Sequence, residues 1–442
     1  MISKSIAIKE GVKLNYIQTN KFKTNYFSFN FITELSNDRS SLNALLPPVL
    51  MRGCEKYKDQ ATINKRLQYL YSGELGARNT KFGEYQIFGI RANMLDNRFC
   101  LGTDVTNETI DLICDMIFEP YLVNGEFNEE YVKGEKISLI DVLESEKNNK
   151  TQHSIKRTMD EMCKNEIFSI SKFGTAKQIN QITSNSLYEA YNYALKNYQI
   201  EIYFVGNCDI EQLGKMLIER FSKIDRTPIS LTSAKTVEKA ECVKEIVDEE
   251  NVKQGKLCLG FRTGYKVEDK QYHLLQLFNE VFGGSPTSKL FMNVREKMSL
   301  CYFCRSIINQ RNGVMLVASG IEFENKQIAQ NAIIEQLEAI KKGEISETEI
   351  ESAKKSIKNG YMQIYDSAES METWAFFRAL CGTQTTPLIE CEKIDAATIT
   401  DVQNIAKKMT LDTIYFLKDK GSEVKNGWYY NTRKLITWRK IS

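Results

Sequence analysis

The chain has 442 residues, of which 42% are hydrophobic and 26% are charged, and its formal net charge is +2. This length allows two to four domains at roughly 150 residues each, and the near-neutral charge excludes a general bias toward nucleic acid or anionic membrane surfaces. No run of about 20 apolar residues is present, and residues 1–10 lack the apolar stretch of a signal peptide. We therefore expect a cytoplasmic protein without a membrane span, whose eleven scattered cysteines are free thiols.

Apolar periodicity predicts clustered strands and helices in both halves of the chain. The first half is expected to contain strands at 12–17 and 25–33, helices at 40–51 and 61–75, strands at 84–92 and 98–103, and helices at 107–118 and 128–145. The second half is expected to contain a strand at 256–263, helices at 271–282 and 287–298, strands at 302–310 and 314–321, and helices at 326–342 and 346–363. Ser346 and Glu349 form a capping box for the last helix. This clustering predicts an α+β fold with mostly antiparallel sheets and helices on one face.

The C-terminal segments of the two halves are similar in sequence and form an internal repeat. Residues 182–205 and 394–417 align without gaps at a constant offset of 212 positions, and each copy reads as a capped amphipathic helix followed by a short apolar strand. The strand motif Ile202-Tyr203-Phe204 matches Ile414-Tyr415-Phe416. Because the register holds through both the helix and the strand, duplication is favoured over chance similarity.

The repeat and the polar run between its copies suggest four segments. We expect an N-terminal half at 1–225, a connector at 226–251, a C-terminal half at 252–421, and a basic, aromatic tail at 422–442. The tail is interpreted either as a docking extension or as a poorly packed terminus.

The segment 282–302 is the most informative part of the chain. It reads as a small-residue turn of Gly283, Gly284 and Ser285, a helix carrying Arg295, a short break, and Tyr302 entering a strand. An arginine and a tyrosine seven positions apart across a helix-to-strand turn can both point into one cleft. Arginine supplies fixed donors for a carbonyl or carboxylate, and a tyrosine hydroxyl can stabilise an oxyanion. In the structural alternative, the arginine caps a helix end, the tyrosine fills a core, and the glycines only permit a tight turn.

The duplicated halves, the Gly-Gly-Ser-x-x-Ser-x-Leu-Phe turn and helix, and the Arg-Glu-Lys-x-x-Leu-x-Tyr segment together resemble the pitrilysin/insulinase family of zinc peptidases. The resemblance covers residues 1–421 and implies a half-clamshell of two homologous peptidase-like halves. In that family one half carries the zinc motif His-x-x-Glu-His, and the other carries an arginine and a tyrosine that bind the substrate carbonyl beside the scissile bond. Arg295 and Tyr302 match this pair, and the resemblance places Gly283, Gly284 and Ser285 at the substrate.

The zinc motif itself is missing from the matching segment. Ala44 and Pro48 stand where the resemblance places histidines, and Pro47 stands where it places the catalytic glutamate. None of the three can ligate zinc or activate water, and the two prolines are expected to kink or shorten the helix. The family's remaining zinc ligand maps to residues 135–143, where Glu135 and Asp141 are expected to be solvated or tethering acids.

The resemblance therefore implies a non-catalytic, substrate-binding subunit of a heteromeric zinc metallopeptidase that processes or degrades peptides. A sibling chain carrying His-x-x-Glu-His would supply the zinc and form a heterodimer around a chamber, while this chain would bind no cofactor and no nucleic acid. It would contribute Arg295 and Tyr302 to the partner's active site, so any enzymatic activity would require that partner. The alternative is a stand-alone inactive homologue that acts as a binding or scaffold protein.

Two further features leave alternatives open. Cys301 and Cys304 form a C-x-x-C motif, as in a thiol oxidoreductase, where such a motif opens a helix. Here it is expected to begin a strand, with the two sulfurs on opposite faces. The strand at 85–91 is interpreted either as an edge strand that can add a bound peptide to its sheet or as an internal strand.

Histidine is scarce, which bears on both metal binding and catalysis. The chain has two histidines, His153 and His273, and no His-x-x-x-His pair. A helix-borne zinc site of two histidines therefore cannot be built from this chain alone. Both residues are interpreted as surface or packing histidines rather than as general bases.

Overall fold

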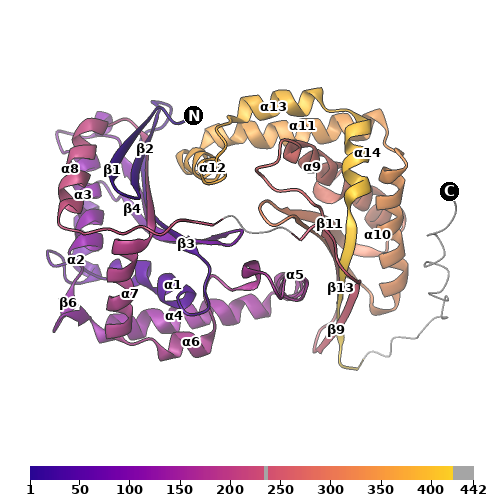
Figure 1. Cartoon of the computed structure of the whole chain (residues 1–442), viewed down its shortest axis with the longest axis horizontal. Coiled ribbons are helices and arrows are strands. Elements are labelled where there is room, and N and C mark those ends of the chain that lie inside the picture. Colours follow the sequence, from indigo (N-terminus) through magenta and orange to yellow (C-terminus); the bar gives the residue numbers. More distant parts are fainter. Residues whose placement is uncertain (233–236, 422–442) are drawn as a thin grey trace.

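The computed structural model describes residues 1–232 and 237–421. These residues form two halves, each built around one large β-sheet with helices packed against it (Figure 1). The tail predicted at 422–442 lies outside the described residues. Within the described ranges, no helix combines the length and the apolar character that crossing a membrane requires.

The first half contains a six-stranded sheet with the order β1-β2-β8-β3-β5-β4. Its strands are β1 (Lys4–Lys9), β2 (Val12–Gln18), β3 (Thr24–Glu34), β4 (Glu74–Phe82), β5 (Tyr85–Leu95) and β8 (Gln199–Gly206), and a small hairpin is formed by β6 (Leu122–Val123) and β7 (Glu126–Phe127). Its helices are α1 (Ser40–Leu50), α2 (Gln60–Tyr69), α3 (Val105–Phe118), α4 (Glu129–Asn148), α5 (Lys150–Met162), α6 (Ala176–Gln181), α7 (Ser184–Asn197) and α8 (Ile210–Ser222). Short 3-10 turns occur at η1 (Asn97–Phe99) and η2 (Ile167–Ser169).

The second half contains a five-stranded sheet with the order β11-β12-β10-β13-β9. Its strands are β9 (Lys244–Glu250), β10 (Gly255–Arg262), β11 (Cys301–Asn309), β12 (Val314–Ile321) and β13 (Thr410–Asp419). Its α-helices are α9 (Tyr272–Asn279), α10 (Lys326–Lys341), α11 (Glu347–Gln363), α12 (Ala368–Leu380), α13 (Pro387–Ala396) and α14 (Ile399–Lys408). Two π-helical segments, η3 (Glu280–Gly284) and η4 (Leu290–Lys297), and two 3-10 turns, η5 (Phe323–Asn325) and η6 (Ile364–Asp366), complete it.

The two sheets share one strand order. Read from the parallel pair, and without the additional edge strand β1 of the first sheet, the first runs β2-β8-β3-β5-β4 and the second β9-β13-β10-β12-β11. The repeated strands also keep one register, because Ile202 of β8 lies opposite Phe29 and Ile414 of β13 lies opposite Leu259. The topology thus agrees with the duplication that the repeat predicts, and the fold is α+β as expected.

Each sheet buries a different set of side chains on each face, because successive residues of a strand point to opposite sides. In β3, Phe27 and Phe29 pack into the core of the first half, whereas Tyr26 and Ile32 belong to the core cluster that the second half dominates. Both faces of the sheet are therefore covered, which explains why this strand is buried along most of its length.

The second face of each sheet is covered by a helix from the other half. Helix α12 of the second half packs on β8 and β3, and α5 of the first half packs on β10 and β13 (Figure 1). The repeated tyrosines face these exchanged helices: the Tyr203 ring lies 5.3 Å from the Phe376 ring of α12, and Tyr415 shares a buried cluster with Ile155 of α5. Each half thus contributes one helix that covers the sheet of the other half, and these two exchanged helices join the halves.

Several predicted elements differ from the structure. Residues 98–103 form no strand, because Asp96 caps the 3-10 turn η1 and Gly102 adopts a positive φ of 81°. The helix expected at 61–75 ends at Tyr69, and residues 74–82 instead form strand β4. The strand at 85–91 belongs to β5, which lies between β3 and β4 and is internal. Residues 244–250 of the expected connector form strand β9.

Pro47 and Pro48 do not shorten helix α1, so the expectation of a shortened helix was wrong. Helix α1 runs to Leu50, and the Met51 amide still donates to the Pro47 carbonyl at 3.1 Å. Proline has no N–H, so Pro47 and Pro48 cost the helix two internal hydrogen bonds. Burial of Leu45, Leu46 and other residues along the helix compensates, since tertiary packing supplies most of a helix's stability in proteins.

Candidate functional site

The position of the absent zinc motif is a packed helix. Ala44 and Pro47 are buried and Pro48 is half-buried on α1, which packs against α4. None of these side chains carries a donor atom for a metal ion. In the part of the chain that the structure describes, no group of three or more His, Cys, Asp or Glu residues is placed to hold one. The residues present therefore do not fit a zinc ion.

Glu135 of α4, where the resemblance places the last zinc ligand, is held by an arginine instead. Arg52, one turn beyond Pro48, lies with its Nε 2.5 Å from Glu135 Oε1 and donates a further hydrogen bond to Gln60 at 3.2 Å. Glu135 thus tethers α4 to the end of α1, and Asp141 is exposed to solvent. Both positions agree with the expectation of tethering or solvated acids.

Arg295 lies on the π-helical segment η4 and is half-buried. Its guanidinium lies 4.5 Å from the centroid of the Phe291 ring, and its Nε lies 3.5 Å from Glu296 Oε1. The turn that follows places Ser299 at a φ of 52°, which non-glycine residues rarely adopt. Wide helical turns and strained backbone are both enriched at functional sites.

Tyr302 is the second residue of the edge strand β11 and is 61% exposed. Its hydroxyl donates to Glu322 Oε1 at 2.5 Å, and this carboxylate raises the pKa of the phenol. The pairing of β11 with β12 shifts register between Cys301 and Phe303, so Tyr302 lies on a β-bulge. Such bulges re-aim side chains beside active sites. Tyr302 therefore does not fill a core.

The surface around the two residues is partly apolar. Met292 and Met298, on and directly after η4, are 49% and 45% exposed. Arg295 also lies close enough to Cys301 to lower the pKa of that thiol, although a hydrogen bond with Cys304 contributes more. The segment thus presents a cation, a phenol and two flexible apolar side chains to solvent, next to the free edge of a sheet.

Gly283, Gly284 and Ser285 form the turn before η4, and each has a packing role. A Cβ atom at Gly283 would lie 2.6 Å from Leu290 Cδ1 and 2.8 Å from the Ser306 nitrogen, so only glycine fits there. A Cβ atom at Gly284 would lie 2.6 Å from a carboxylate oxygen of Glu280. The buried Ser285 hydroxyl donates to the Glu280 carbonyl at 3.1 Å. Their assignment to substrate binding stays a prediction.

The sulfurs of Cys301 and Cys304 are neighbours, contrary to the expected opposite faces. The bulge inserts an extra residue between them and thereby cancels the alternation of the strand. Both residues are buried, at 8% and 4% exposure, and the hydrogen bond between the thiols lowers the pKa of Cys301 and raises that of Cys304. Neither lies at a helix N-terminus, which is where redox-active C-x-x-C motifs gain thiolate character.

The two histidines lie in packed surroundings. His153 of α5 places its Nε2 3.4 Å from Glu250 Oε1, and burial lowers its pKa. His273 of α9 is half-buried, and burial lowers its pKa as well. Both therefore favour the neutral form and serve packing.

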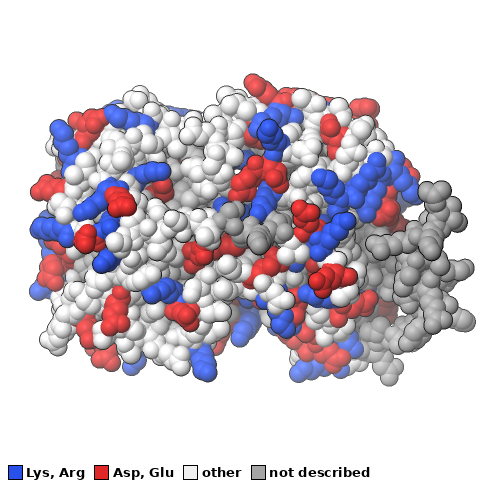
Figure 2. All heavy atoms as spheres, in the orientation of Figure 1, with Lys and Arg blue, Asp and Glu red and all other residues white. Residues whose placement is uncertain are grey.

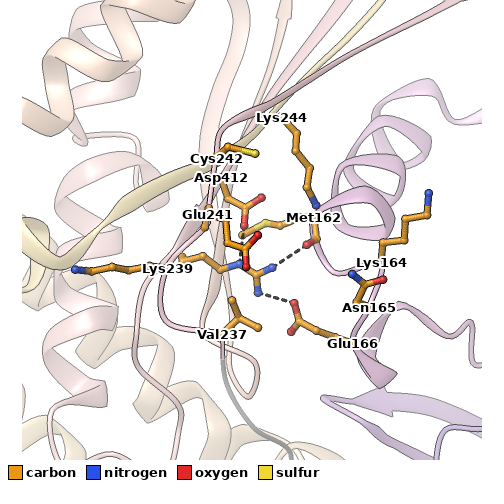
Figure 3. A pocket seen from close by; sticks show the side chains of 12 residues that line it. Met162, Lys164, Asn165, Glu166, Val237, Lys239, Glu241, Cys242, Lys244 and Asp412 are labelled. Atoms are coloured by element: carbon orange, nitrogen blue, oxygen red, sulfur yellow. Dashed lines mark hydrogen bonds and ion pairs between the residues drawn. The ribbon is translucent and has the colours of Figure 1, made fainter. Parts of the chain in front are cut away.

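A hollow of about 340 Å3 lies where the end of α5 meets the connector (Figure 3). Arg262 forms ion pairs there with Glu166 at 2.7 Å and Asp412 at 2.8 Å, and it donates to the Met162 carbonyl at 2.8 Å. These bonds engage all three nitrogens of the guanidinium. The network therefore links β10, β13 and the end of α5.

One contact of the site and one contact between the halves could not be found from the sequence. Glu322 lies twenty residues after Tyr302, and no local motif connects them. The cross-half ion pair of Arg78 with Glu372 joins residues 294 positions apart, with side-chain exposures of 10% and 0%. The pair of Arg78 with Glu372 arises from the packing of α12 on the first sheet, which hydrophobic periodicity in the sequence does not predict.

Comparison with known proteins agrees with this arrangement. Residues 181–357 match the family model described as the peptidase M16 inactive domain. Over 409 residues the chain is 33% identical to a Bacillus subtilis protein named probable inactive metalloprotease YmfF, and the match covers 92% of this chain and 96% of that protein.

Solved structures show the same fold over nearly the whole chain. A protein from Enterococcus faecalis V583 superposes with a TM-score of 0.88 at 29% identity, covering 95% of this chain and 99% of that one. A peptidase M16 inactive domain from Pseudomonas fluorescens superposes with a TM-score of 0.76 at 15% identity, again covering 95% and 99%.

Proposed function

The chain is an inactive member of the M16 (pitrilysin/insulinase) peptidase family, and we propose that it is the substrate-binding subunit of a two-chain zinc peptidase. A sibling chain with an intact His-x-x-Glu-His motif would supply the metal site. This chain would supply Arg295 and Tyr302, and the two chains would together enclose the peptide substrate.

One observation carries the proposal: the first half has no metal ligands on the helix where the zinc motif would lie, whereas the second half exposes an arginine and a tyrosine to solvent. The helix of Ala44, Pro47 and Pro48 offers no metal ligand. Arg295 and Tyr302 are accessible to a second molecule, although a core-filling tyrosine would be buried. The positive φ of Ser299 and the bulge at Tyr302 show that the backbone between the two residues departs from ordinary helix and strand geometry.

The chemistry that the pair can perform follows from its donors. The Tyr302 hydroxyl would donate to the carbonyl oxygen that gains negative charge, and the Arg295 guanidinium would hold a neighbouring backbone carbonyl. A phenol hydroxyl has one hydrogen to donate, and Tyr302 donates it to Glu322 in this structure. The hydroxyl would therefore turn from Glu322 to the substrate when the complex forms.

Co-expression with a sibling chain from the same genome tests the proposal. We expect the two chains to copurify and to cleave peptides in a zinc-dependent reaction. Tyr302→Phe removes one oxyanion donor and should lower turnover about 10²–10³-fold, and Arg295→Ala should also lower turnover while assembly remains intact. Tyr69→Phe, at an exposed tyrosine on α2, is the matched control. Unchanged turnover in both site variants would refute the role.

The engagement of Tyr302 with Glu322 favours a second candidate, a stand-alone binding or scaffold protein. In that case the phenol is a surface residue with a permanent partner. No sibling chain would then form an active pair with this protein, and the Tyr302 and Arg295 variants would change nothing.

A further inference from the structure

A cavity of about 610 Å3 lies beside α5, where this helix leaves the first half to cover the second sheet. Its walls come from the end of α4, from α5, from the loop at 168–176, and from Lys81 on β4. This volume is within the range of about 300–1,000 Å3 that small-ligand sites occupy. The cavity contains none of the residues of the Arg295 and Tyr302 site.

Two lysines in this cavity hold their ammonium groups without a carboxylate partner. Lys81 Nζ donates to the carbonyl oxygens of Phe168 and Ile170 and lies 4.0 Å from the centroid of the Phe168 ring. Lys172 Nζ donates to the Asn79 carbonyl at 2.9 Å and lies 4.7 Å from the Phe173 ring. Both groups therefore lie where β4 meets the loop at 168–172.

Burial makes these charges costly for the empty protein. It lowers the pKa of Lys81 to about 8 and also lowers the pKa of Lys172, to which Glu146 gives only long-range support. The other cations on α5 already have partners, because Lys156 pairs with Asp160, and Arg157 pairs with Glu161 and Asp248. A partly desolvated ammonium gains most from a new anion nearby.

Apolar atoms make up most of the cavity surface, although the carboxylates of Glu144, Glu146 and Asp160 also line it. Its hydrophobic lining residues are Leu143, Ile155, Met159, Phe168, Phe173 and Ala176. A ligand that fits both features must carry a negative charge directly beside an apolar group. The last residue of a peptide does so within one residue, because its terminal carboxylate and its side chain share one Cα atom.

We propose that this cavity binds the C-terminal end of a peptide, whose carboxylate accepts hydrogen bonds from Lys81 and Lys172 and whose last, apolar side chain packs against the cavity wall. The ammonium groups retain donors for this purpose, since an ammonium has three and the observed bonds use two at Lys81 and one at Lys172. This inference goes beyond the proposed function, because binding needs only this chain.

Fluorescence anisotropy on the purified full chain tests the inference. The probe is a hexapeptide labelled at its N-terminus and ending in Leu-Phe with a free carboxylate, and the matched probe is its C-terminal amide. We expect the acid to bind and the amide to bind at least about tenfold more weakly, since the amide forms no charge-assisted hydrogen bond with the lysines. Equal affinity of acid and amide would overturn the proposal without any mutation.

Substitutions then locate the site. Lys81→Met and Lys172→Met keep side-chain length but remove the charge, and each should weaken acid binding about tenfold while leaving the already weak amide binding unchanged. Lys133→Met, at an exposed position of α4 outside the cavity, is the control and should bind like the unaltered chain. Unchanged affinity in both cavity variants, with unchanged melting temperatures, would place binding elsewhere and overturn the assignment.

Two further arms test the identity of the ligand and the role of charge. Dodecanoate also joins a carboxylate to an apolar group, but it is a lipid. If far higher concentrations of dodecanoate than of unlabelled peptide are needed to displace the probe, the result supports a peptide site, whereas tighter binding of dodecanoate overturns it.

The pH dependence of binding tests the role of the Lys81 charge. Lys81 faces Asp160 and Lys156 of α5, Cys163, and Glu84. Since its pKa is about 8 in the empty protein, affinity should fall by up to about tenfold from pH 7 to pH 9; a flat profile contradicts the proposal.

Discussion

The two halves share a strand order and differ in the helix that follows their first long central strand. In the first half this helix is α1, which buries Ala44 and Pro47 and presents no metal ligand. In the second half α9 leads into the π-helical segments that carry Arg295. The shared order rests on buried apolar residues of the strands, whereas the difference lies in the helix that covers them, which is packed in the first half and partly exposed around Arg295 in the second. The same strand order therefore supports two different local surfaces.

The exchanged helices differ as well. Helix α12 is held on the first sheet by a buried charge, because Glu372 accepts hydrogen bonds from Arg78 and from Ser28. Helix α5 is held on the second sheet by apolar contacts of Ile155 and by half-exposed ion pairs such as that of Arg157 with Asp248. Both directions also use the other kind of contact, because Phe376 of α12 packs on Tyr203 and the buried Arg262 of β10 bonds the carbonyl of Met162 at the end of α5.

The largest expected effect comes from breaking the buried pair. Glu372→Ala leaves the Arg78 guanidinium buried without its partner and should lower the free energy of unfolding by about 3–5 kcal/mol. Glu369→Ala removes the neighbouring pair with Arg91, whose side chains are 43% and 42% exposed, and should cost less than about 1 kcal/mol. Urea unfolding of both variants measures the difference. Similar losses would show that the exchange does not depend on buried charge.

The next effect concerns the helix that distinguishes the halves. Pro48→Ala restores an N–H that can donate to the Ala44 carbonyl and should stabilise the chain by about 1–2 kcal/mol. Pro387→Ala is the control, because proline at the start of α13 removes no helical hydrogen bond. Thermal unfolding compares the two. A loss of stability at Pro48 would mean that its ring contributes more through packing than it costs the helix.

A smaller effect is expected at the Arg295 and Tyr302 site. Glu322→Ala removes the acceptor of the Tyr302 hydroxyl, so the pKa of this phenol should fall toward its ordinary value. The titration of Tyr302 is obtained as the absorbance difference between each protein and its Tyr302→Phe derivative. With a sibling chain present, turnover should rise by up to about tenfold, because substrate no longer competes with a carboxylate.

Glu324→Ala, at an exposed neighbouring position, provides the matched control for Glu322 and should leave the phenol titration unchanged. An unaltered titration in Glu322→Ala as well would show that the carboxylate does not hold the hydroxyl in solution.

The smallest expected effect is a pH dependence at the exchanged helix α5. Burial lowers the pKa of His153 in the folded chain, so the unfolded chain takes up this proton first as the pH falls. Stability should therefore decrease as the pH drops below about 6.5 and level off below the folded-state pKa. His153→Gln should remove this part of the slope in unfolding measured at about pH 7.5 and pH 5.5. An identical slope in the variant would exclude His153 as the cause.

Edge strands β4 and β9 and helices such as α5, α8 and α12 are among the elements that the sequence did not reveal. The two strands are rich in charged and polar residues, because one side of an edge strand faces solvent, and the start of β4 was therefore interpreted as the end of a helix and β9 as part of the connector. In contrast, β3 and β12 are buried along most of their length and were predicted within a few residues. The capping box of Ser346 and Glu349 was also predicted correctly, since it depends on residues three positions apart.

Patterns in the sequence were enough to predict the duplicated α+β architecture and to identify the Arg295 and Tyr302 spacing, and the resemblance to a family marked Ala44, Pro47 and Pro48 as the position of the zinc motif. These inferences depend on residue identity and on gap-free spacing, which a single chain displays directly. Only the tertiary structure showed that α5 and α12 each pack on the sheet of the other half. It also showed that Tyr302 forms a hydrogen bond with Glu322 and that a bulge brings Cys301 beside Cys304. Those features arise from packing between distant segments and from one irregular strand pairing, and no periodic pattern encodes either.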